Sequence, residues 1–370
     1  MLESYCRGMK IGQTHVAQRT KPQALAKETP DTKGALIIID SFQSPESHGF
    51  AVEGAAGTVG DTGEVLRVHQ HLNVGGRATL PHVEAFKKMQ SPMSEAPLSA
   101  DQAEQTLSGF VEEAAAGNLE HATAVLHEVS QRGYENSVVN YSQGLDAIVL
   151  MQLVKHPLSK GSDLLNDQKQ VYFENLKVAL FPEAPSSLPV EELDKSLLRK
   201  IKSVLSESDV IQAARSKWQG QVRDFESDHN SVVIAAGNSG GAVKGLKHAG
   251  FDIDGSEDIN IFATPEVTVV GALTQLPKGG LGLASRSSFG NEVGFLASGD
   301  YGKDGGTSFA SPRVANAMRA SHLANPKLTS EEAENWARAE LSTSAEVLGH
   351  TVAILDDGRT QSLIRLLDRL

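Results

Sequence analysis

Short, unbroken apolar runs recur along the sequence, and they constrain its fold more than any other feature. The runs at 35–39, 231–236, 267–272 and 293–297 are rich in β-branched residues and too short for buried helices. Such runs favour strands that are buried on both faces, as in a parallel sheet covered by helices. Stretches of helical periodicity separate them, which is typical of right-handed βαβ units. The sequence therefore predicts a three-layer α/β fold, with a mostly parallel sheet flanked by helices.

Three segments organise the chain. Residues 1–33 are polar and interrupted by prolines, so we expect an irregular N-terminal arm. Residues 34–370 contain all the apolar runs and are expected to form one domain. Within that domain, 145–228 has apolar residues at helical spacing over most of its length. We therefore predict a helical insertion at about 145–228.

Residues that disfavour a helix predict some of the helix boundaries. The pair Gly117-Asn118 predicts a break between one helix over 100–116 and a second over 121–131. Near the end of the chain, the pattern predicts a strand at 351–355 and a last helix at 361–370.

Charge and composition exclude some partners. The net charge of −12 argues against nucleic acid or an anionic membrane surface, because both are bound by clustered Lys and Arg. Cys6 is the only cysteine, so no intrachain disulfide can form. Neither a Sec signal nor an apolar run of membrane-spanning length is found. We expect a soluble protein that is cytoplasmic or exported by a signal-independent route.

Four polar residues stand where strands end or helices begin. Asp40 ends the first apolar run, and Asn238 follows the run at 231–236. His48 and Ser308 each open a stretch of helical pattern. Because ligands bind beyond the carboxyl ends of parallel strands, these four side chains are expected to meet at one edge of the sheet.

Each of the four residue types suits one chemical task. Ser308 at a helix N-terminus is a candidate nucleophile, with backbone N–H groups beside it for a developing oxyanion. His48 would take and return the proton, and Asp40 would orient the imidazole and stabilise its charged form. Asn238 would donate its side-chain N–H to the oxyanion.

The sequence around these residues resembles the subtilisin-like serine proteases, the subtilase family. The resemblance rests on Ile39-Asp40-Ser41, Ser47-His48-Gly49, Ala235-Ala236-Gly237-Asn238-Ser239-Gly240 and Gly306-Thr307-Ser308-Phe309-Ala310-Ser311-Pro312, which follow the family's order. It implies a subtilisin-like catalytic domain and a serine endopeptidase that hydrolyses peptide bonds of protein substrates through an acyl-enzyme on Ser308. It also implies the substrate-binding residues. The substrate would lie along Tyr141, Ser142, Gln143 and Gly144, with one side chain between that strand and Ala235, Ala236 and Gly237.

The chain departs from the family in several places. Only seven residues separate Asp40 from His48, and the stretch after Gly144 is much longer than usual. Residues 60–118 contain no recognisable calcium-binding loop, so we expect no structural calcium and no other cofactor. The 33 leading residues are too few for the usual inhibitory propeptide.

Other interpretations of these residues stay open. Ser308 could be a helix N-cap, and Asn238 a turn residue. His69 and His71 share one face of a predicted strand, but no third ligand lies nearby, so we interpret them as surface histidines and predict no metal site. Two alternative functions remain. One is a partner-regulated effector or maturation protease with low basal activity, whose partner binds the insertion, and the other is a pseudoprotease that binds proteins.

Overall fold

A computed structural model describes residues 34–42, 47–57, 64–69, 86, 89, 98–182, 190–301 and 304–369 of the chain. The strands are β1 (Leu36–Asp40), β2 (Val65–His69), β3 (Val138–Tyr141), β4 (Ser231–Ala235), β5 (Thr268–Gln275), β6 (Leu281–Leu283), β7 (Val293–Ser298), β8 (Asp300–Tyr301), β9 (Asp304–Gly305), β10 (Ser342–Val347) and β11 (His350–Leu355). The helices are α2 (His48–Ala56), α4 (Ala100–Ser130), α5 (Ala147–Lys155), the 3-10 helix η1 (His156–Leu158), α6 (Asn166–Leu180), α7 (Val190–Glu207), α8 (Asp209–Glu226), α9 (Gly240–His248), α10 (Thr307–Ala324), α11 (Ser330–Glu340) and α12 (Asp357–Leu367).

One mostly parallel sheet runs through the molecule, as the apolar runs predict. Its strand order is β10-β11-β7-β5-β4-β3-β1-β2, with β6 paired to β5. All neighbours along this path are parallel except β10 and β11. The carboxyl ends of the parallel strands therefore lie at one edge, and β1, β3 and β4 are direct neighbours there.

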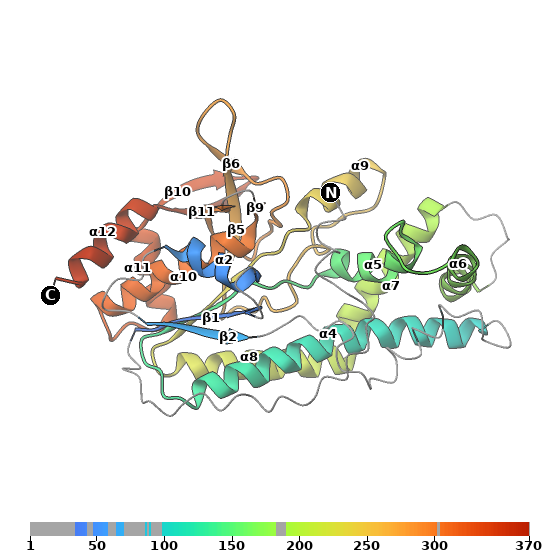
Figure 1. Ribbon diagram of the computed structural model, residues 1–370, viewed down its shortest axis with the longest axis horizontal. Coiled ribbons are helices and arrows are strands. Elements are labelled where there is room, and N and C mark those ends of the chain that lie inside the picture. The colour runs from blue at the N-terminus through green and yellow to red at the C-terminus, as the bar shows by residue number, and fades with distance from the viewer. Residues whose placement is uncertain are drawn as a thin grey trace.

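Helices cover both faces of this sheet, so the fold is a three-layer α/β fold (Figure 1). Alternation along β1 shows why both faces are apolar. Ile37 and Ile39 join the core beneath α4 and α8, whereas Leu36 and Ile38 join the core formed with α2 and α10. All four side chains are at most 1% exposed. The apolar run at 35–39 thus serves two cores at once, which accounts for its lack of polar residues.

Helix α4 differs from the sequence prediction, because it runs unbroken from Ala100 to Ser130 through the expected stop at Gly117-Asn118. The Asn118 side chain donates to Ala114 O at 2.6 Å, so its amide is satisfied within the helix instead of ending it. Helix α4 also packs along α8 and α6, and this tertiary contact outweighs the helix propensity lost at two positions.

The stretch predicted to be a helical insertion contains α5, η1, α6, α7 and α8. Helix α8 lies against α4 and β4, and its Trp218, Val222 and Phe225 belong to the core of the sheet. Helices α5, α6 and α7 instead gather beside the N-terminal half of α4, at one end of the molecule (Figure 1). We call these three helices the helical lobe. The lobe begins three residues after Gly144, beside the sheet edge where the candidate site lies.

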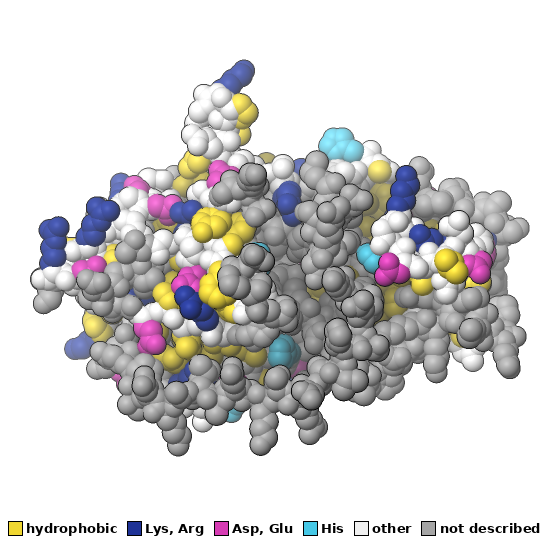
Figure 2. Space-filling model, viewed as in Figure 1, with side chains coloured by type: hydrophobic (Ala, Val, Ile, Leu, Met, Phe, Trp, Pro, Cys, Tyr) yellow, Lys and Arg dark blue, Asp and Glu magenta, His cyan; other side chains and the backbone are white. Residues whose placement is uncertain are grey.

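The C-terminal part of the chain closes the other end of the sheet. Strand β11 confirms the strand predicted at 351–355, and α12 begins four residues before the predicted helix. The sequence pattern missed β10, because this edge strand is polar and largely exposed. A hairpin of β5 and β6 projects from the body, with hydrophobic side chains on it that include the exposed Leu276 and Leu281 (Figure 2).

A buried arginine joins the beginning of the sheet to the C-terminal half of the chain. Arg319 of α10 is fully buried and donates through Nη1 to Gly34 O at 3.0 Å and through Nε to Asn316 Oδ1 at 3.1 Å. Burial lowers the pKa of this guanidinium to about 10. The contact fixes α10 across the N-terminal end of β1, so the helix that begins near Ser308 is held at both ends.

Candidate active site

Asp40 and His48 are in direct contact at the carboxyl end of β1. The Asp40 side chain is almost completely buried, and its two oxygens lie 3.0 and 2.9 Å from His48 Nδ1. The Asp40 carboxylate also accepts a hydrogen bond from Ser41 N. A carboxylate at Nδ1 fixes the ring orientation and assigns that nitrogen its proton.

The short connection between Asp40 and His48 folds back on itself. Gly49 N donates to Ser41 O at 2.9 Å, so the first turn of α2 is bonded to the residue after Asp40. Phe42 packs edge-on against Phe50, with ring centroids 5.2 Å apart. A Cβ on Gly49 would lie 2.7 Å from Ser41 O and from the Phe42 ring, so only glycine permits this approach. These contacts support His48 without the longer connection that the family resemblance implies. Residues 43–46 lie outside the described part of the chain.

Ser308 lies in the first turn of α10, the helix that packs against α2 and its His48. The His48 ring centroid is 5.5 Å from that of Phe309, the residue that follows Ser308. Helices α2 and α10 also pack against each other along this contact. The Ser308 side chain is buried, and its Oγ donates to Ser142 O at 3.1 Å. The helix thus brings its N-terminal N–H groups and the Ser308 hydroxyl to the same edge as the imidazole.

Pro312 explains how the first turn of α10 is joined to β3. A proline has no N–H, so Ser308 O loses the donor that would bond it four residues along the helix. Ser142 Oγ replaces that donor at 3.3 Å, and Asn140 Nδ2 in turn donates to Ser142 Oγ at 2.6 Å. The backbone of the candidate nucleophile is therefore bonded to the strand predicted to bind substrate.

Asn238 follows β4 and contacts the same helix end. Its Oδ1 accepts hydrogen bonds from Thr307 N at 3.1 Å and from Thr307 Oγ1 at 3.3 Å. The Thr307 N–H can only donate, so this contact assigns the amide orientation and directs Nδ2 away from Thr307. Gly306 has a φ of 153°, and a Cβ there would lie 2.7 Å from Asn238 Oδ1. Glycine at 306 is thus needed for Asn238 to reach the helix.

The predicted substrate-binding residues lie where β3 and β4 end. Tyr141 pairs with Ile234 in parallel register, so the segments 142–144 and 235–237 leave the sheet side by side. The Tyr141 ring itself is fully buried against Phe262, with centroids 4.8 Å apart, so only its backbone could meet a substrate. These two segments, which we call the seam, flank Ser308 and Asn238.

The sequence patterns did not single out several residues that hold the seam. Asn260 is 1% exposed and donates through Nδ2 to Gln143 O at 3.3 Å and to Ala235 O at 2.8 Å. Ser287 and Ser288 are buried and accept hydrogen bonds from Ala272 N and Ser239 N. No local sequence motif indicates these roles, because each depends on two segments that meet only in the folded chain.

A buried pair of carboxyl groups lies behind Gly237. Asp146 caps α5 by accepting from Val149 N at 2.8 Å, and its Oδ2 lies 3.4 Å from where a Cβ of Gly237 would be. Burial, helped by the nearby Asp258, raises the pKa of Asp146 to about 7. Burial likewise raises the pKa of Asp258. Asp146 therefore takes up a proton at a higher pH than an ordinary aspartate does.

Two further features were searched for in the described residues. No group of three or more His, Cys, Asp or Glu side chains in this part of the chain could hold a metal ion. No helix among those described is long and apolar enough to cross a membrane. His71 and the arm at 1–33 lie outside the described residues, and His69 is described only as the backbone partner of Asp40 in β2.

No family model matches the sequence, and no curated protein matches it. Among solved structures, a lanthipeptide protease is 12% identical, with a TM-score of 0.41 over 90% of this chain and 87% of that one. A cold adapted subtilisin-like serine proteinase is 14% identical, with a TM-score of 0.37 over 88% of this chain and 90% of that one. A chain of the subtilase cytotoxin SubAB assembly is 20% identical, with a TM-score of 0.31, and the match covers 41% of this chain. This chain spans 55% of the length of that last relative. Identities and TM-scores this low carry no argument about function, so any function proposed for this chain rests on the site itself.

Proposed function

We propose that this protein is a serine endopeptidase that cleaves protein or peptide substrates through an acyl-enzyme on Ser308. The observation that carries the proposal is the contact of both Asp40 oxygens with His48 Nδ1, on an imidazole that packs beside the helix of Ser308. A buried carboxylate that orients a histidine next to a serine at a helix N-terminus is the arrangement that makes a serine nucleophilic.

The reaction follows from the roles of these groups. Ser308 Oγ attacks the carbonyl carbon of the scissile bond, while its proton passes to His48 Nε2. The oxygen of that carbonyl becomes negative, and Asn238 Nδ2 and backbone N–H groups at the start of α10 donate to it. The C–N bond then breaks as His48 returns the proton to the leaving amine. Water, deprotonated by His48, attacks the ester carbonyl and releases Ser308 with its proton restored.

A fluorophosphonate probe tests the nucleophile directly. We expect covalent labelling of Ser308 in the folded protein and none in Ser308→Ala, because only an activated serine attacks the phosphorus. Ser216→Ala is a matched control, since Ser216 is an exposed serine of α8 whose hydroxyl donates to Gln212 O of the same helix. An unlabelled Ser308 in folded protein would instead support a pseudoprotease.

A partner-regulated protease is the second candidate, and one observation favours it. The Ser308 hydroxyl donates to Ser142 O, whereas an attacking serine must give its proton to the imidazole. The helical lobe starts immediately beyond this segment, so a partner bound to the lobe could shift it. Low basal activity that rises when 145–228 is bound or trimmed would support regulation. Strong constitutive cleavage of casein would contradict it.

A further inference from the structure

The position of the cleaved residue follows from the site just described. In the proposed reaction, the attacked carbonyl lies between Ser308 Oγ and Asn238 Nδ2. Ser308 Oγ lies against Ser142 O on one side of the seam, and Asn238 directly follows Gly237 on the other. The residue that carries this carbonyl, called P1, therefore lies over the seam, and its side chain would have to enter between 142–144 and 235–237.

The seam is closed at this point. A Cβ built on Gly144 would lie 3.4 Å from Gly237 Cα. With a Cα–Cβ bond of about 1.5 Å, the two Cα atoms lie within about 5 Å of each other, close to the spacing of paired strands. A side chain between two backbones needs about 3.5–4 Å to each of them, which is at least about 7 Å in total. No side chain fits at this level of the seam.

Asn260 holds the seam closed. Its Nδ2 donates to Gln143 O on one segment and to Ala235 O on the other, so one amide group bridges both. Its Oδ1 accepts from Leu145 N at 3.4 Å and from Phe262 N at 3.3 Å. The amide is buried and makes these four contacts, so separating the segments would leave buried donors and acceptors without partners.

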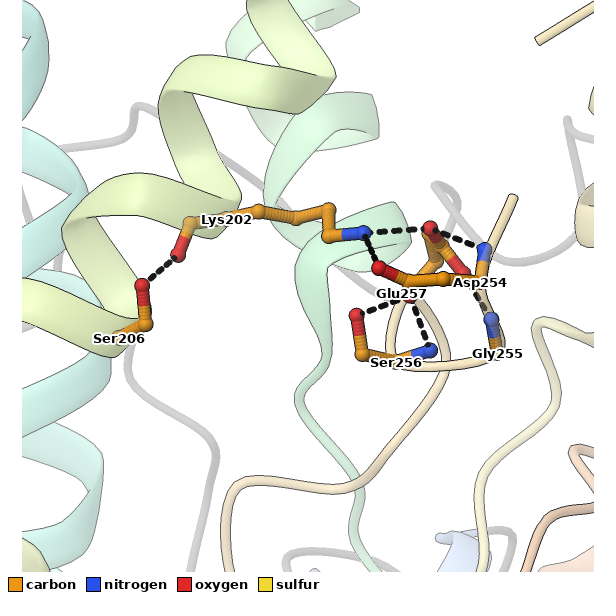
Figure 3. Close-up of polar contacts among 6 residues, drawn as sticks. All are labelled: Lys202, Ser206, Asp254, Gly255, Ser256 and Glu257. Carbon is orange, nitrogen blue, oxygen red and sulfur yellow. Dashed lines mark hydrogen bonds and ion pairs between the residues drawn. The ribbon is translucent and has the colours of Figure 1, made fainter. Parts of the chain in front are cut away.

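The surroundings prevent Gly237 from moving aside. A Cβ on Gly237 would lie 3.2 Å from Ser288 Oγ and 3.4 Å from Asp146 Oδ2, so these groups fill the space behind it. The loop that leads to Asn260 is also fixed. Glu257 accepts from Asp254 N, Gly255 N and Lys202 Nζ of α7, and its own carbonyl accepts from Ile148 N. Figure 3 shows Lys202 reaching from its helix to Asp254 and Glu257.

We propose that the enzyme is specific for glycine at P1, and that Asn260 is the residue that imposes this specificity. The inference rests on the proposed serine endopeptidase function and deepens it by naming the substrate class, peptides cleaved after glycine. Glycine has no Cβ, so it alone can present its carbonyl to Ser308 while the seam stays closed. Any larger P1 residue must first break the contacts of Asn260.

A peptide library that varies only P1 tests the proposal on the full chain. We expect kcat/KM for P1 glycine to exceed that for leucine, phenylalanine or arginine at least about 100-fold, because the larger residues require the seam to open. Comparable cleavage after a large residue would overturn the glycine proposal and leave the endopeptidase function intact. Labelled Ser308 without cleavage of the glycine peptide would also overturn it. If Ser308 were not labelled and no peptide were cleaved, both the endopeptidase function and the glycine specificity would be contradicted.

Two variants separate the role of Asn260 from a general effect on folding. In Asn260→Ala, we expect the ratio of kcat/KM for P1 alanine to that for P1 glycine to rise at least about 10-fold. This ratio is independent of the fraction of enzyme that folds. Asn118→Ala is the matched control, because Asn118 is another buried asparagine whose amide donates to a backbone carbonyl, inside α4. An unchanged ratio in Asn260→Ala, or the same rise in Asn118→Ala, would contradict the role of Asn260. If Asn260→Ala does not fold, the wild-type P1 profile decides the proposal.

Discussion

The candidate catalytic groups and the helical lobe are held in the molecule by different kinds of contact. Asp40, His48, Asn238 and Ser308 are held by short bonds at the ends of adjacent elements, and most of these bonds involve the backbone. The lobe packs on α4 through apolar side chains of the main core, such as Tyr172 and Leu197, and adds ion pairs between distant side chains, such as Lys202 with Glu257 and Lys200 with Glu104. From this difference we expect substitutions among the four candidate residues to change the rate of the proposed reaction, and substitutions at the lobe's ion pairs to change substrate choice.

Asp40→Asn tests the catalytic role of the contact between Asp40 and His48 and should have a large effect on activity. The substitution keeps the shape of the side chain but presents an amide to His48 Nδ1, which favours the wrong tautomer. We expect kcat to fall about 10⁴-fold, with little change in KM. Steady-state kinetics on a peptide with P1 glycine measure this. Glu53→Gln is a control on α2, because Glu53 faces Arg67 instead of the site. A loss smaller than about 10-fold would exclude the role of Asp40 as the orienting group.

Asn238→Ala should lower kcat less than Asp40→Asn does. One donor to the oxyanion disappears, and we expect kcat to fall about 10²–10³-fold, the loss measured for such a donor in subtilisin. KM should change little, because the bond to Asn238 forms only in the transition state. A raised KM with unchanged kcat would instead make Asn238 a binding residue. Since Thr307 N also loses its acceptor, the thermal stability of the variant should be measured alongside.

Lys202→Met tests the ion pair that joins the helical lobe to the loop of Glu257 and Asn260. The substitution removes the ammonium from Glu257, a fully buried carboxylate, and we expect a loss of about 1–3 kcal/mol in the free energy of unfolding. The P1 alanine-to-glycine ratio should rise a few-fold, because the loop that carries Asn260 loses one anchor, while kcat for P1 glycine stays near the wild-type value. Lys195→Met is the control, since its pair with Glu192 is more exposed and worth at most about 0.5 kcal/mol. A large fall in kcat in Lys202→Met would show that the lobe supports the chemistry itself.

The last prediction concerns how the ionisation of the buried Asp146 changes the stability of the fold with pH. Burial raises its pKa to about 7 in the folded protein, well above that of an unfolded aspartate. The folded state therefore binds more protons than the unfolded state between about pH 4 and 7, and the stability from this group falls as pH rises through that range. Asp146→Asn keeps the cap on α5 but cannot ionise. Relative to wild type, the variant should gain stability between pH 5 and 8, on the order of 2–3 kcal/mol.

Urea unfolding at several pH values measures this difference. His322 contributes with the opposite sign, since burial lowers its pKa to about 4 and acid must charge it. That contribution is common to wild type and variant, so it cancels in the comparison. A difference between the two proteins that does not change with pH would contradict a protonated Asp146.

Much of the fold and the four candidate catalytic residues could be predicted from the sequence because their signals are local. A run such as 35–39 identifies a buried strand by itself, and the end of that strand locates Asp40. Asn260 gave no such signal, because its role exists only after three loops have met. The continuation of α4 through Gly117-Asn118 was also missed, since packing against α8 outweighs the local preference. Contacts between distant segments account for both failures.

The bond from Arg319 to Gly34 O has a consequence for the protein during its synthesis. The groups proposed for catalysis come from both halves of the chain, and Ser308 lies in a helix that Arg319 bonds to the start of β1. A nascent chain on the ribosome would therefore carry Asp40 and His48 without a working partner until α10 has emerged. Such a chain cannot carry out the proposed reaction before α10 has been synthesised.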